Sequence, residues 1–249
     1  MPMRDRQRLP AVRPAAAAGH QYSEEVFALS KIRLRFSKTG MGKYISHLDL
    51  LRTFTRAIQR AGLPVMYSQG FNPHQKLTFS LPLPVGVTSE CECVDVEFTE
   101  QPAPEFLCAA LNKNLPMDIH ILSASEPRYA ANTIVSAEYR TTLGLTAPIL
   151  DEALRQFFGA PEIAVVKKSK KGERTVNLLS FVKAYEVQQN TENQLILRVV
   201  LDAGGERNLK PELLVNALEA VLQPQGFTTI DVHRQQIFCQ QGDALQPFA

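Results

Sequence analysis

The sequence predicts an α+β protein built from two consecutive βαββαβ units. Three observations lead to this prediction. Apolar and polar residues alternate in short segments typical of strands, amphipathic segments of helical length lie between them, and the same order of elements recurs in the second half. Each unit would form a four-stranded antiparallel sheet backed by two helices, so we expect two tandem ferredoxin-like domains. At 249 residues the chain is long enough for two small domains.

The first predicted strand covers residues 31–38. Its apolar residues Ile32, Leu34 and Phe36 alternate with basic ones. Because successive side chains of a strand point to opposite faces, this pattern predicts one buried face and one cationic open face.

A helix is predicted from residue 47 to residue 61. Ser46 is a favourable N-cap, and Asp49 stands three residues later in a capping-box position. Gly62 and Pro64 then end the helix. Three arginines recur every four residues along one side of this helix.

The remaining elements follow from the same kind of pattern. In the first unit we expect strands at 65–68, 76–81, 90–98 and 118–123, and a helix at 104–115. In the second we expect strands at 133–145, 163–166, 175–178, 194–201 and 227–239, and helices at 148–158 and 211–222. The predicted domains are therefore 29–126 and 127–249, preceded by a disordered, basic, Pro-containing tail at 1–28.

Charge is distributed unevenly along a chain whose net charge is only +2. Residues 31–89 contain nine Lys or Arg and one acid, Asp49, whereas residues 90–126 contain eight acids and one cation, Lys113. Such a block of positive charge suggests that the protein binds a polyanion, and RNA is the candidate polyanion.

Several functional classes receive no support from the composition. The four cysteines form no CxxC pair, so the sequence predicts neither a zinc site nor an iron–sulfur site, and no metal ligands are assigned. No apolar run has the length of a membrane helix. We expect a cytoplasmic protein without a membrane partner.

The first candidate site combines the cationic strand face with the glycine-rich loop and the helix that follow it. A glycine-rich loop before a helix can offer N–H groups to an anion, although the spacing of Gly40 and Gly42 is not that of a Walker P-loop. The candidate phosphate ligands are Arg33, Arg35, Lys38, Lys43, His47, Arg52, Arg56 and Lys76. The alternative is a solvated strand face followed by an ordinary loop.

The second candidate site is the segment SQGFNPHQK at residues 68–76. Phe71 could stack on a splayed base, with Gln69, Asn72 and His74 donating or accepting hydrogen bonds beside it. Alternatively, Phe71 fills the core of a structured loop. The sequence leaves both possibilities open.

Two further features have a functional and a structural interpretation. His47, in the first turn of the helix among arginines, could act as a general acid or base in RNA cleavage, or could simply support the helix. The lysines at 167, 168, 170 and 171 could extend an RNA track or form a solvated hairpin turn.

Residues 36–92 contain the motifs SHLDL, RAGLP, YSQGFNPH and PLPVG. Through them the chain resembles the bacterial radical SAM-associated (radical SAM-linked) family, a domain of unknown function found alone or fused to a radical SAM enzyme. The second half is similar through AEYR at 137–140 and the Lys-rich hairpin. It departs from the family pattern at 177–180, where this chain reads NLLS.

The resemblance implies a partner protein, a radical SAM enzyme, and does not indicate a reaction for this chain. The radical SAM enzyme would carry the 4Fe-4S cluster and S-adenosylmethionine, and this chain would hold no cofactor. The leading hypothesis is an RNA-binding accessory of that enzyme, acting on RNA or a ribosomal component. The alternatives are a metal-independent endoribonuclease using His47, similar to CRISPR repeat-processing enzymes, and a protein–protein adaptor.

Overall fold

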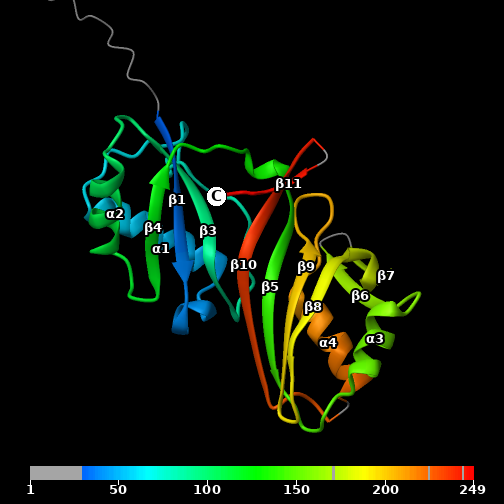
Figure 1. Cartoon of the computed structure of the whole chain (residues 1–249). Coiled ribbons are helices and arrows are strands. Elements are labelled where there is room, and N and C mark those ends of the chain that lie inside the picture. The colour runs from blue at the N-terminus through cyan, green and yellow to red at the C-terminus, as the bar shows by residue number, and fades with distance from the viewer. Residues whose placement is uncertain (1–29, 170–171, 224, 243) are drawn as a thin grey trace, which may run out of the picture.

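The computed structural model describes residues 30–169, 172–223, 225–242 and 244–249 (Figure 1). The strands are β1 (Ser30–Lys38), β2 (Leu77–Phe79), β3 (Val87–Phe98), β4 (Ile119–Ser125), β5 (Ile134–Gly144), β6 (Ala164–Ser169), β7 (Gly172–Asn177), β8 (Val182–Asn190), β9 (Gln194–Asp202), β10 (Thr229–Gln241) and β11 (Ala244–Pro247). The helices are α1 (His47–Arg60), α2 (Pro104–Asn112), α3 (Asp151–Gly159) and α4 (Pro211–Leu222), with single 3-10 turns η1 (Gly40–Tyr44), η2 (Ala131–Thr133) and η3 (Leu178–Phe181). The predicted tail at 1–28 lies outside the described residues.

The structure confirms a mixed α+β architecture with a large, mostly antiparallel sheet. Within the described part of the chain, this sheet has the strand order β4-β1-β3-β10-β5-β9-β8, with β2 added on β3 and β11 on β10. Helices α1 and α2 lie beside its first strands and α3 and α4 beside its last ones (Figure 1). The hairpin of β6 and β7 forms a separate two-stranded sheet.

The two halves share this sheet instead of forming the two separate sheets expected from the sequence. β2 pairs with β3 only at residues 94–96, so the other end of the same edge of β3 is left for another strand. There, residues 232–234 of β10 pair in parallel with residues 87–89 of β3. An unpaired strand edge offers free N–H and C=O groups to another strand. Because β2 is short, part of the β3 edge stays free, and β10 pairs there and joins the two halves into one sheet.

Some predicted elements differ from the observed ones. The strands expected at 65–68 and 76–81 reduce to isolated bridges at Val65 and Tyr67 and to the three-residue β2. Strand β8 was not predicted, because most of its residues are exposed and it lacks an apolar alternation. By contrast, the predicted α4 has the observed bounds.

The buried apolar residues form two clusters. One lies between α1, α2 and strands β1, β3 and β4, and contains Leu34, Phe36 and Phe54. The other surrounds β5, β9, α3 and α4 and also takes in Leu81 and Leu83 from the first half. The second cluster therefore depends on the proline-rich segment that precedes β3.

Helix α1 begins as predicted. The Ser46 hydroxyl accepts a hydrogen bond from the Asp49 N–H at 3.2 Å, which satisfies one of the free N–H groups of the first turn. The helix ends at Arg60, and Gly62 adopts a positive φ of 64° shortly after it. None of the helices in the described part of the chain has the length and apolarity required to span a bilayer.

Candidate nucleic-acid interface

Arg33 does not lie on an open cationic face. Its guanidinium donates two hydrogen bonds to the Asp95 carboxylate, at 2.7 and 3.0 Å, and only 3% of the residue is exposed. The ring of Phe248, near the end of the chain, covers it at 4.1 Å. Lys31 adds a second cation 3.8 Å from Asp95. Arg33 therefore cannot serve as a phosphate ligand, because the neighbouring strand neutralises it and Phe248 excludes solvent.

The other candidates on β1 are also engaged by the protein. Lys38 is 1% exposed, and its ammonium group donates to the Ile45 carbonyl at 2.8 Å. Burial lowers the pKa of Lys38, an effect partly opposed by Glu92. Arg35 is half-buried and donates from Nε to the Glu90 carbonyl at 3.2 Å. Lys38 is thus excluded as a phosphate ligand, and Arg35 is only partly accessible.

The glycine-rich loop is already occupied by a carboxylate. Asp118 accepts a hydrogen bond from the Gly42 N–H at 3.1 Å, and its own carbonyl accepts one from the Thr39 N–H at 2.9 Å. A Cβ at Gly40 or Gly42 would approach Asp118 atoms to 2.6 or 2.9 Å. The glycines thus make room for Asp118, which corrects the expectation of an open anion-binding loop.

Three more candidate cations are paired with acids. Lys43 lies 3.7 Å from Asp231, Lys76 lies 2.9 Å from Glu97, and Arg52 lies 2.9 Å from Asp49. These three pairs are at least partly exposed, so each contributes little to stability, but each reduces the local positive field.

Three exposed cations lie together in a groove between α1 and the end of α2. Arg56, Arg60 and Lys113 line it together with Thr53 and Asn114, and its volume is about 420 Å³. All three cations are exposed, and no ion pair joins them to a described residue. We call this feature the cationic groove.

Only Arg56 of these three was among the predicted ligands. Arg60 belongs to the same every-four pattern in α1, so the sequence contained a signal for it. Lys113 stands alone within an acidic segment, and only the packing of α2 against β4 brings it to α1.

The loop at 68–76 exposes its aromatic residue. Phe71 is fully exposed at the tip, which corrects the interpretation that it fills the core, and Gln69 and Asn72 are exposed beside it. The base of the loop is fixed, because the Ser68 hydroxyl and the His74 Nδ1 are hydrogen-bonded at 2.8 Å. Buried Gln75 donates to the Thr55 carbonyl of α1 at 3.3 Å. The loop therefore presents Phe71 from a fixed position next to α1.

His47 is exposed in the first turn of α1. Its ring contacts Phe79 edge-to-face, with 5.3 Å between the ring centroids. No hydrogen bond joins the ring to another described residue, so no neighbouring side chain prepares it for proton transfer.

The remaining candidate features provide no further site. Burial raises the pKa of Cys91 and of Cys93 to about 12, which is typical of unreactive core thiols. Among the described residues, no group of His, Cys, Asp or Glu could hold a metal ion. In the lysine run, Lys167 donates to the Asn208 carbonyl, whereas the side chains at 168, 170 and 171 lie outside the described part.

Comparison with solved structures finds similar chains at low identity. One, from the crystal structure of a Cbf5–Nop10–Gar1 complex, has a TM-score of 0.47 and 12% identity over 83% of this chain and 48% of that chain. Another, from the archaeal box H/ACA sRNP Nop10–Cbf5 complex, has a TM-score of 0.43 and 12% identity over 84% of this chain and 48% of that chain. The chain thus spans about half the length of these chains.

Comparison with curated proteins gives no match. One family model matches residues 31–211, from the second residue of β1 to the first residue of α4. The chain belongs to this family, described as an uncharacterized protein conserved in bacteria (DUF2344).

Proposed function

We propose that this protein is a cytoplasmic, non-catalytic RNA-binding accessory of a radical SAM enzyme. The main observation in support of RNA binding is the cationic groove. Arg56 and Arg60 lie one helical turn apart, about 6 Å along the axis of α1. Lys113 reaches the same groove from the end of α2. Three like charges around one concavity repel each other, and a phosphate backbone would relieve that repulsion.

A structural role alone is a weaker explanation of these cations. Arg60 lies in the last turn of α1 and Lys113 caps α2, and cations at helix C-termini are favourable without a ligand. That effect does not require the two helix ends to share a groove with Arg56. Phosphate binding accounts for the whole arrangement.

The loop at 68–76 would supply base contacts. Phe71 offers an aromatic face for stacking, and Asn72 and Gln69 offer amide groups for base edges. Because Gln75 anchors the loop at Thr55, beside Arg56, the groove and the loop are both fixed to α1. The groove lies toward β4 and the loop toward β2, so a single strand that contacts both would cross the exposed side of α1.

The proposed partner rests on the sequence resemblance of residues 36–92 to radical SAM-associated proteins. In this proposal the partner enzyme carries the 4Fe-4S cluster and S-adenosylmethionine. The chain described above presents an RNA or a ribosomal component to it.

We also interpret each half as a ferredoxin-like unit. The first half has the order β4-β1-β3-β2 and the second β10-β5-β9-β8, which is the same relative order, with β6 and β7 inserted before β8.

The RNA proposal is tested by salt titration with a short, labelled single-stranded RNA. Three phosphate contacts predict that log Kd rises by about 2 per log unit of salt, at about 0.7 per contact. Undetectable or salt-independent binding would refute the proposal. The same samples, kept in EDTA, should show intact RNA. Cleavage that His47→Ala abolishes would support the endoribonuclease instead.

A further inference from the structure

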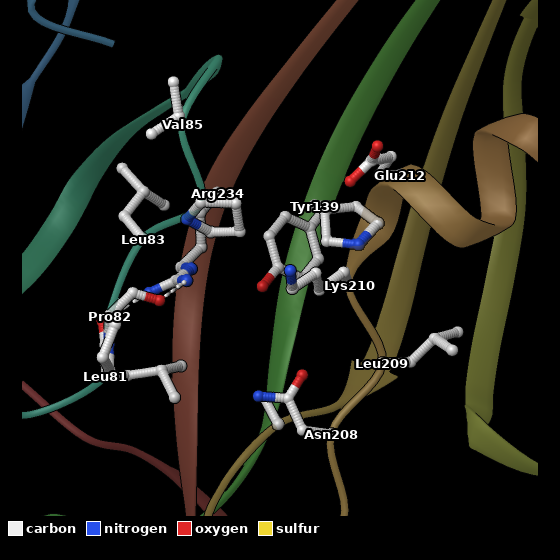
Figure 2. A pocket seen from close by; sticks show the side chains of 13 residues that line it. Leu81, Pro82, Leu83, Val85, Tyr139, Asn208, Leu209, Lys210, Glu212 and Arg234 are labelled. Carbon is white, nitrogen blue, oxygen red and sulfur yellow. Dashed lines mark hydrogen bonds between the residues drawn. The ribbon is translucent and has the colours of Figure 1, made fainter. Parts of the chain in front are cut away.

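A second cavity lies where the two halves meet, away from the cationic groove. Its volume is about 420 Å³. Arg234 of β10 and Tyr139 of β5 form its floor, Leu81 and Leu83 stand on one side, and Lys210 stands on the other (Figure 2). The cavity is thus lined by the PLPVG and AEYR motifs, to which the proposed RNA function gives no role.

Arg234 is an unusual residue to find in a cavity wall. It is 1% exposed and donates to Glu92 at 3.1 Å and to the Leu81 and Pro82 carbonyls, each at 3.1 Å. The guanidinium also interacts with the Tyr139 hydroxyl, but its buried Nε forms no regular hydrogen bond with a described residue. A buried donor without a regular hydrogen bond is unfavourable, so a ligand that satisfies it would be favoured.

The buried charges near the cavity do not balance. Lys38 and Arg234 interact electrostatically with the same carboxylate, Glu92, and all three residues are at most 4% exposed. Two buried cations therefore face one buried anion. An excess buried charge is unfavourable, and a nearby anion would reduce the cost.

The rim of the cavity adds one cation and one anion. Lys210, the N-cap residue of α4, supplies the cation, and its side chain makes no capping bond. Glu212 also lines the cavity and offsets the charge of Lys210. The remaining positive excess is about one charge, which suits a monoanion better than a phosphate with two.

The other wall is apolar. It consists of Leu81, Pro82, Leu83, Pro84 and Val85. Cavities of this kind, an apolar wall with a few convergent polar groups, are typical of small-ligand sites.

We propose that this seam cavity binds a small organic carboxylate with an apolar body, whose carboxylate lies by Arg234 and Lys210 and whose body packs on the proline-rich wall. The site is independent of RNA binding, so either proposal can fail alone.

Calorimetric titration of the full chain with hexanoate tests this site, with 1-hexanol as the neutral probe of the same length. We expect hexanoate to bind at least about tenfold more tightly. Equal binding of the two probes, or no binding of hexanoate, would overturn the proposal. N-acetyl-leucyl-leucine against its amide then distinguishes a free acid from the carboxyl end of a peptide.

Substitutions at exposed residues test the same site without disturbing the fold. Lys210→Glu should weaken hexanoate binding at least about fivefold, and Asn208→Phe, which fills the cavity, should abolish it. Lys113→Glu changes the net charge by the same amount as Lys210→Glu, but residue 113 lies in the cationic groove. This variant should therefore bind hexanoate with the affinity of the wild type. Unchanged binding in Lys210→Glu and Asn208→Phe would refute the assignment.

Discussion

The Asp118 carboxylate accepts a hydrogen bond from the Gly42 N–H at 3.1 Å. The two residues lie 76 positions apart in the sequence, one in the basic segment and the other in the acidic one. Ion pairs join the same two segments: Arg33 and Lys31 pair with Asp95, and Lys76 pairs with Glu97. Much of the charge asymmetry along the chain is therefore cancelled by pairing within the first half, and the field that remains comes from a smaller set of cations.

Replacing Gly42 should destabilise the protein through its contact with Asp118. In Gly42→Ala the new Cβ would lie 2.9 Å from the Asp118 Cβ, and we expect a loss of about 1–3 kcal/mol in the free energy of unfolding, measured with urea. Gly159→Ala is the matched control, since a Cβ there meets no atom within 4 Å. Equal unfolding midpoints for the two variants would contradict the role given to Asp118.

Arg33 should behave as a structural residue. Arg33→Ala leaves the buried Asp95 carboxylate without its bidentate partner, and we expect a loss of about 3–5 kcal/mol in the free energy of unfolding. The double variant Arg33→Leu with Asp95→Leu should recover part of that loss, because no unpaired charge remains. Urea denaturation of the three proteins would show this order. A loss below about 1 kcal/mol for Arg33→Ala would mean that the pair is solvated.

The cysteines should differ in their reactivity in the folded protein. Burial raises the pKa of Cys91 and Cys93 to about 12, so at pH 8 almost none of either thiol is the nucleophilic thiolate. Cys108 is only partly buried, and we expect iodoacetamide to modify it first. Mass spectrometry of the native protein would locate the label. Early modification of Cys91 or Cys93 would show that the strand pairing around β3 opens readily.

The sequence predicted local structure well and charge pairing poorly. Helix α4 was predicted with its observed bounds, because Pro211 at its first position and the apolar periodicity are local signals. The pairing of Arg33 with Asp95 spans 62 residues, and that of Arg234 with Glu92 spans 142. A count of charges along the chain does not detect such partners.

The candidate site was predicted in part for the same reason. Arg56 and the loop at 68–76 were identified as candidates, although the sequence left open whether Phe71 is exposed. Lys113 was missed because it stands among acids in the sequence. The merging of the sheets was also missed, since it depends on how much of the β3 edge the short β2 leaves free.

The most direct test of the RNA-binding proposal is the affinity for single-stranded RNA of the double variant Arg60→Glu with Lys113→Glu. The control is Arg128→Glu with Arg140→Glu, an equal charge change at exposed residues outside the cationic groove. By fluorescence anisotropy at fixed salt, we expect the groove variant to bind at least about tenfold more weakly than the control. Equal loss of affinity in both variants would contradict the account, because it would show that net charge, and not the cationic groove, governs binding.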